Sequence, residues 1–206
     1  MVKLSTAYFP PISWFALALK SQVELEFCEN FLKQSYRNRC HLTNAGGLQA
    51  LSIPVEHNGK VPIGEIRISY KENWQQIHLR ALESAYFNSP YFEELHSELL
   101  NMYKHFKPEY LWSWNFNTIQ WLCKWLNIKL EIHQSKVFIP QSPEAEGDFR
   151  YSIHPKKPEL FCFPTYNQVF DHKIGFIEGL STLDLLCQLG PDAYSYLYNL
   201  KRKNEG

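Results

Sequence analysis

The chain has 206 residues, and its 21 Lys and Arg are balanced by 21 Asp and Glu, so its formal net charge is zero. A neutral chain lacks the broad positive surface by which proteins bind nucleic acid or anionic membranes, and we expect neither partner. Apolar residues make up 45% and charged residues 20%, which excludes a disordered chain. This length fits one sizeable core, so we predict a single domain over residues 1–206.

The five cysteines form no C-x-x-C pair, and their odd number argues against a disulfide framework and against a zinc site. No apolar run approaches the roughly 20 residues that cross a bilayer. Pro10 and Pro11 precede the apolar stretch 12–19 and would break the helical core of a signal peptide. We therefore expect a reduced, cytoplasmic protein that does not insert into a membrane and holds no metal.

Strand patterns dominate the first third of the chain. Loose alternation predicts a strand over 2–8, and the pattern V-E-L-E-F predicts a half-exposed strand over 23–27. Pro11 suits the first turn of a helix that should run between them to about Lys20. The Asn58-Gly59 pair favours a hairpin among three further strand-like runs, which cover residues 37–43, 50–55 and 61–69.

Helical spacing of apolar residues replaces this alternation in the middle of the chain. Asn73 should cap the first helix, with Gln76 reaching back to complete a capping box. We predict helices over residues 74–86, 89–105 and 109–126, and then a strand over 129–133.

A proline-rich loop over residues 140–158 separates these helices from the end of the chain, and loops of this length are usually either functional or mobile. A final pair of helices follows. Ser181 and Asp184 form an S-x-x-D cap for the first, and Gly190-Pro191 ends it and begins the second. Because the strands come mostly before the helices, we predict an α+β fold, with N-terminal strands in a mixed sheet and a mainly helical second half.

His78 is the most informative single residue, because it lies on the apolar stripe of its predicted helix. It is either a core histidine with satisfied hydrogen bonds or a general base at the wall of a cleft. Cys40 could pair with it as a nucleophile, although nothing in the sequence brings the two together.

Cationic side chains gather in two places. Arg37 and Arg39 would share one face of a strand and could hold a carboxylate or phosphate, or they could lie on a solvated strand edge. Arg150 and Lys156 lie on the proline-rich loop, which is either a ligand-binding flap or an ordinary polar loop. No Gly-rich phosphate loop, H-E-x-x-H or G-x-S-x-G motif appears, and we expect no cofactor.

Motifs along nearly the whole chain together resemble one known family. They are Thr6–Pro11 with Phe15, Lys33–Cys40, Leu51–Val55, Trp74 with His78, Ala85–Tyr86, Ser89–Phe92, Asp148 with Arg150, Ile153–Lys156, Tyr166–Phe170, Gly175–Phe176 and Leu180–Leu186. In this order they resemble the WbqC-like family, in the form common in Bacteroidetes. Gly179 departs from the asparagine usual before the Leu-Ser pair, and Cys187-Gln188 replaces a more typical Phe-Asn.

The resemblance implies a role in the biosynthesis of bacterial surface polysaccharide (O-antigen), with acyl or aminoacyl transfer onto an amino sugar or nucleotide-sugar as the concrete reaction. His78 would be the catalytic base. The substrate-binding set would be Asn38, Arg39, Trp74, Arg150, Lys156, Gln168 and Asp184. Within it, the cations would hold an anionic donor or a nucleotide-sugar phosphate, and the carboxamides would position carbonyls or sugar hydroxyls.

Two other functions fit the same residues. The chain could bind a glycan or nucleotide-sugar without turning it over, and its 16% aromatic content suits that function equally well. It could also be an assembly partner in a polysaccharide complex, with exposed aromatic side chains as the interface. The sequence leaves the choice between an enzyme and a binding protein open, and with it the oligomeric state.

Overall fold

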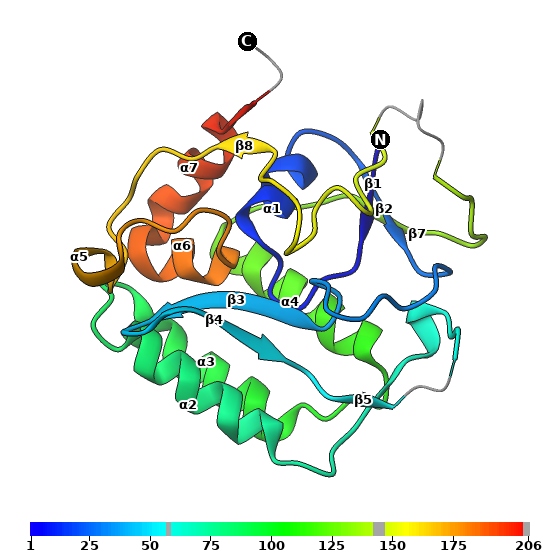
Figure 1. The fold of residues 1–206 in the computed structure, drawn as a ribbon, viewed down its shortest axis with the longest axis horizontal. Helices are drawn as coiled ribbons and strands as arrows, with labels where there is room; N and C mark the ends of the chain where they lie inside the picture. The colour runs from blue at the N-terminus through cyan, green and yellow to red at the C-terminus, as the bar shows by residue number, and fades with distance from the viewer. Residues whose placement is uncertain (57–58, 142–146, 204–206) are drawn as a thin grey trace.

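A computed structural model describes residues 1–56, 59–141 and 147–203, and its first sheet has three parallel strands in the order β1-β2-β7 (Figure 1). The strands are β1 (Val2–Ser5), β2 (Val23–Glu26) and β7 (Ile132–Gln134). The helix α1 (Ile12–Ala18), buried along its whole length, connects β1 to β2. The last strand, β7, begins three residues later than the alternation predicts, and it joins the N-terminal sheet from far along the chain.

A hairpin forms the second sheet. β3 (Arg39–Asn44) pairs with β4 (Gly47–Ser52) in antiparallel register around Ala45 and Gly46. Two shorter pairs follow, namely β5 (Val55–Glu56) with β6 (Arg67–Ile68), and β8 (Phe161–Cys162) with β9 (Lys201–Arg202). A 3₁₀ turn, η1 (Ile63–Glu65), precedes β6. Asn58, on which the predicted hairpin turn depends, lies outside the described residues.

Three long helices confirm the periodicity in the middle of the chain, and shorter helices follow the proline-rich loop. The long ones are α2 (Trp74–Tyr86), α3 (Phe92–His105) and α4 (Leu111–Trp125). The later ones are α5 (Asp171–Ile174), α6 (Thr182–Leu189), η2 (Gly190–Asp192) and α7 (Ala193–Asn199).

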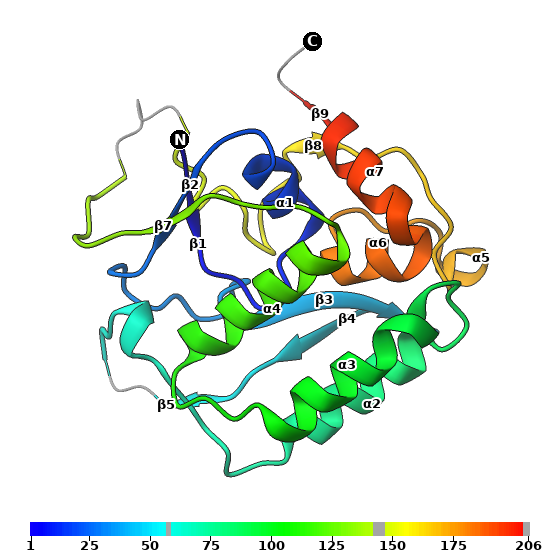
Figure 2. The same cartoon turned by 180° about the vertical axis from the view of Figure 1, so that it is seen from behind.

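The β3–β4 hairpin crosses the middle of the molecule. In Figure 1, α2 and α3 lie side by side below it, while α1, α6, α7 and the parallel sheet lie above it. In Figure 2, which views the molecule from behind, α4 lies in front of β3. The helix α2 contacts β3, and α6 contacts both α3 and α4, so the lower and upper parts share one apolar cluster.

The α+β class is confirmed, because parallel and antiparallel strands come before the main helices. These strands are distributed over small sheets: among the described residues, β3 and β4 form a two-stranded hairpin separate from the parallel sheet. The helices are therefore what joins the sheets into one core.

The helix caps follow the sequence in one case and depart from it in another. Ser181 caps α6 as predicted, because its Oγ accepts a hydrogen bond from the backbone N–H of Leu183 at 3.2 Å. The capping box at Asn73 is wrong: its side-chain amide donates to Gln76 Oε1 at 2.8 Å, and neither side chain bonds a free backbone group of α2. The two carboxamides bond to each other instead.

Candidate functional site

A buried hydrogen-bonded chain joins His78 on α2 to residues of two other segments. His78 Nδ1 lies 2.9 Å from the hydroxyl of Tyr8, which follows β1. The hydroxyl of Tyr8 also bonds to the hydroxyl of Tyr103 on α3. His78 is 4% exposed and Tyr103 is 2% exposed, so the whole chain of contacts is enclosed.

Aromatic rings surround His78. The ring of Trp74, one turn earlier on α2, meets it edge-on at a centroid distance of 5.1 Å. Trp74 in turn packs against Trp114 of α4 at 5.0 Å. The indole Nε1 atoms of both tryptophans are buried and have no hydrogen-bond partner among the described residues. These contacts bury the imidazole between α2, α3 and α4.

Burial decides the charge of His78. It lowers the pKa of the imidazole to about 4, and a hydrogen bond to the backbone of Ser52 opposes this only in part. His78 is therefore neutral at pH 7 and can accept a proton, although a base of such low pKa is a weak one.

Cys40 lies against Tyr8 on the other side of the same cluster. Burial raises the pKa of its thiol well above the usual value, so the thiolate is absent at neutral pH. Because Tyr8 occupies His78 Nδ1, the pairing of Cys40 as nucleophile with His78 as base has no support in this geometry.

The backbone around Tyr8 is strained. Phe9 has a φ of 39°, in the left-handed region that bulky side chains rarely adopt and that costs on the order of 1–3 kcal/mol. Two bonds from the start of α6 hold it there: Ser181 Oγ donates to the Phe9 carbonyl at 2.9 Å, and the Thr182 N–H donates to the Pro10 carbonyl at 2.9 Å. The N-terminal motif thus needs α6 to fix the direction of Tyr8.

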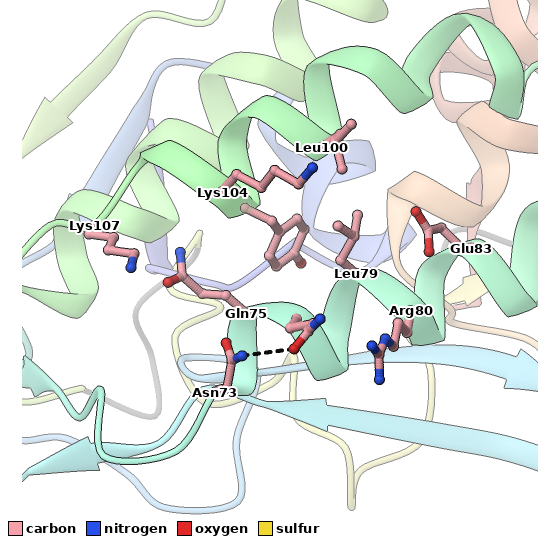
Figure 3. Close-up of a pocket in the computed structure, with 10 residues that line it drawn as sticks. Asn73, Gln75, Leu79, Arg80, Glu83, Leu100, Lys104 and Lys107 are labelled. Atoms are coloured by element: carbon pink, nitrogen blue, oxygen red, sulfur yellow. Dashed lines mark hydrogen bonds between the residues drawn. The ribbon is translucent and has the colours of Figure 1, made fainter.

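A groove of about 420 Å³ lies between α2 and α3, next to this cluster (Figure 3). Tyr103 forms part of its wall, and His78 lies behind Tyr103, outside the lining. Polar and cationic side chains dominate the rest of the lining, which comprises Asn73, Gln75, Gln76, Leu79, Arg80, Glu83, Leu100, Lys104 and Lys107.

Asn38 and Arg39 lie at the start of the hairpin. Asn38 Nδ2 donates to the carbonyl of Ile53 at 2.8 Å, and its Oδ1 is buried with no partner among the described residues. Arg39 Nε donates to Ser52 Oγ at 3.0 Å across the hairpin. Because Ser52 also contacts His78, Arg39 reaches the histidine through one intervening residue.

Arg150 lies in a second cluster, at the carboxyl ends of the parallel strands. Its guanidinium binds Asp148 with bonds of 2.5–3.1 Å, Glu26 at 2.7 Å and the carbonyl of Ile139 at 2.8 Å. With 1% of its surface exposed, Arg150 has its donors directed at protein acceptors. Lys156 is exposed nearby on the loop and bonds Gln34 Oε1 at 3.0 Å.

Gln168 and Asp184 form a third cluster. The side chain of Gln168 donates to the carbonyl of Ile177 at 2.8 Å and accepts from its N–H at 2.9 Å, which closes the segment around α5. The hydroxyl of Tyr166 donates to Asp184 Oδ2 at 2.7 Å. Asp184 is fully buried, and desolvation raises its pKa to about 6 against the opposing effect of the Tyr166 and Tyr86 hydroxyls.

The predicted site residues thus occupy three places. Trp74 and His78 share the first, with Arg39 at its edge. Arg150 belongs to the second, and Gln168 with Asp184 to the third. Tyr8 and Tyr103 were missed as partners of His78. Tyr8 lies inside the N-terminal motif, but nothing in the sequence signals a contact across 70 positions.

The chain belongs to the WbqC-like protein family, whose family model matches residues 6–156. It is also similar to a protein of Mycobacterium tuberculosis (strain ATCC 25618 / H37Rv) described as "Uncharacterized protein Rv1507c", with 23% identity over 81% of this chain and 83% of that protein. No solved structure matches the chain. The matched region holds the first two clusters, whereas Gln168 and Asp184 lie beyond it.

No helix in residues 1–56, 59–141 or 147–203 has the length and apolar character that crossing a membrane requires. Within the same ranges, no group of three or more His, Cys, Asp and Glu side chains could hold a metal ion.

Proposed function

We propose that the chain is a cytoplasmic protein of bacterial surface-polysaccharide biosynthesis that binds a sugar derivative in the groove between α2 and α3. The observation that carries this proposal is the groove itself, a hollow of about 420 Å³ with fixed carboxamides along one side. Small-molecule sites have volumes of roughly 300–1,000 Å³ and a few placed polar groups.

The carboxamides suit sugar hydroxyls. Gln75 Nε2 donates to the carbonyl of Phe106 at 3.0 Å, and the amide of Asn73 donates to Gln76 Oε1. These bonds hold the amide planes in place at little further entropic cost on binding. The buried side chains of Tyr103 and Leu79 form the apolar floor of the groove.

Acyl or aminoacyl transfer is the second candidate, and the contacts from Tyr103 through Tyr8 to His78 favour it. When an acceptor amine attacks the donor carbonyl, its proton would pass to Tyr103. The Tyr103 proton would pass to Tyr8 and the Tyr8 proton to His78 Nδ1, while the leaving group departs from the acyl carbon. His78 is a positioning residue in this scheme, because two tyrosines separate it from the groove.

Binding ranks above transfer because of burial. The hydroxyl of Tyr103 bonds inward to Tyr8, and the phenol is 2% exposed. Transfer therefore requires α2 and α3 to separate enough for an acceptor to reach that oxygen, whereas binding uses the groove as it stands.

Calorimetric titration of the intact protein with amino sugars, their phosphates and nucleotide-sugars tests the proposal. We expect saturable binding of at least one, weakened by Gln75→Leu and unaffected by Gln49→Leu, which lies on β4 outside the groove. Mass spectrometry after adding acyl donors then separates the two candidates. A product that disappears in Tyr103→Phe while the sugar still binds establishes transfer, and binding without product establishes the binding protein. No saturable binding of any sugar derivative would refute both.

A further inference from the structure

The groove between α2 and α3 carries three cations that no acid neutralises. Arg80 projects from α2, Lys104 from the last turn of α3, and Lys107 from the segment after it (Figure 3). None of them has an ion-pair partner in the part of the chain that the structure describes. Glu83, the carboxylate of the lining, bonds to His96 Nε2 at 2.8 Å and sets one negative charge against the three positive ones. The groove therefore holds uncompensated positive charge.

The buried arginines show the opposite arrangement. Arg37 is paired with Glu29 at 2.6 Å, and Arg150 with Glu26 at 2.7 Å. The charge of a buried guanidinium that is paired with a buried carboxylate is neutralised inside the protein. The charge of the groove cations is available to a ligand, whereas the family resemblance pointed to Arg39, Arg150 and Lys156 as the binding cations.

The arrangement of the groove cations selects for an anion with several charged oxygens. Arg80 lies on α2 and Lys104 on α3, and both line the groove. The Arg80 guanidinium points away from α3 in Figure 3, so a bound group contacts both cations once these flexible side chains turn toward it. Guanidinium binds phosphate through two parallel hydrogen bonds, and ammonium adds a point charge. The formal net charge of the chain is zero, so the excess of positive charge in the groove is balanced by negative charge elsewhere in the chain.

We propose that the groove between α2 and α3 binds the phosphate groups of a phosphorylated sugar through Arg80, Lys104 and Lys107. The sugar part of this ligand rests on the proposed function, whereas the phosphate part rests on the groove cations alone. Two sources share this chemistry, a sugar phosphate and the diphosphate of a nucleotide-sugar.

Titration calorimetry with inorganic pyrophosphate tests the phosphate part in the intact protein. We expect saturable binding that Arg80→Gln and Lys104→Gln each weaken by about threefold and the double variant by about tenfold. Lys71→Gln, an exposed lysine outside the groove, is the matched control and should bind as the wild type does. Arg80→Lys should recover part of the loss, because it restores the charge without the bidentate geometry.

Five further probes distinguish the two phosphate sources and separate a failure of this inference from a failure of the proposed function. A hexosamine phosphate and UDP-N-acetylglucosamine are compared with uridine diphosphate, and either of the first two binding more tightly than pyrophosphate supports the inference and identifies the source. Equal pyrophosphate affinity in the wild type and the double variant overturns it, and so does binding of a short DNA duplex without binding of pyrophosphate. Pyrophosphate binding without any sugar binding would refute only the proposed function. Neutral amino-sugar binding without pyrophosphate binding would refute only this inference.

Discussion

Asp184→Asn should stabilise the protein at neutral pH while changing little in acid. The carboxyl is fully buried on α6, and its pKa is raised from 3.8 to about 6 by desolvation. Below about pH 4 both the folded and the unfolded chain hold the proton, and burial costs nothing extra. Between about pH 4 and pH 6 the unfolded chain releases this proton while the folded chain keeps it, so the stability falls as the pH rises over this interval. At about 1.36 kcal/mol per pKa unit, the loss reaches about 3 kcal/mol by pH 7.

The measurement is the free energy of unfolding in urea, taken for wild type and variant between about pH 4 and pH 8. The stability of Asp184→Asn relative to wild type should grow by about 3 kcal/mol across this interval. The new amide also changes the contact with Tyr166, but this changes the free energy of unfolding by the same amount at every pH. It therefore does not alter how the difference between variant and wild type depends on pH. Histidines that titrate in the same interval are present in both proteins and cancel.

Asp192→Asn is the control, because Asp192 is exposed at the start of α7 and should leave the pH dependence as it is. Parallel pH curves for wild type and Asp184→Asn would refute the reasoning, since they would mean that the buried carboxyl ionises at the same pH in both states.

Three further substitutions test other contacts, each by urea unfolding. His78→Gln should reduce the acid sensitivity, because the pKa of His78 falls to about 4 on folding and its contribution to stability, present above pH 6.5, is lost toward pH 4. The reduction should be about 3 kcal/mol, with His41, whose pKa also falls to about 4, supplying a remainder, and an unchanged acid limb would contradict this. Arg150→Met should cost about 3–5 kcal/mol at pH 7, because Glu26 would be left buried without its partner; a cost below about 1 kcal/mol would show that the pair is replaceable. Gly179→Ala should cost more than about 1 kcal/mol, because a Cβ at a φ of 69° would lie 2.0 Å from Glu159 Oε1, and wild-type stability would rule out that contact.

Local patterns in the sequence predicted the helices well. The apolar spacing of α2, α3 and α4 follows from burial of one face of each helix, and the structure buries those faces. The strand over V-E-L-E-F was also predicted, and β2 ends at Glu26. This carboxylate is buried because Arg150, more than a hundred residues later in the chain, pairs with it.

The candidate site was less predictable, for the same reason. His78 was found from its place on the stripe of α2, whereas its partners Tyr8 and Tyr103 come from two other elements. The cations of the groove were missed because exposed Lys and Arg on helices are ordinary, and only the packing of α2 against α3 shows that they face a shared hollow. Side-chain partners across such separations are set by tertiary packing, which no local pattern encodes.

The order of the contacts along the chain has a consequence for synthesis on the ribosome. β1 and α1 emerge first, but Val23 of β2 pairs with Ile132, and the N–H of Ile12 bonds to the carbonyl of Leu180. At about 5–20 residues per second, the apolar N-terminal segment waits on the order of 10–40 s for these partners. During that time its strand edges are open to wrong pairing. We expect the nascent chain to depend on chaperones until α6 has emerged, and chains that end before Leu180 to aggregate.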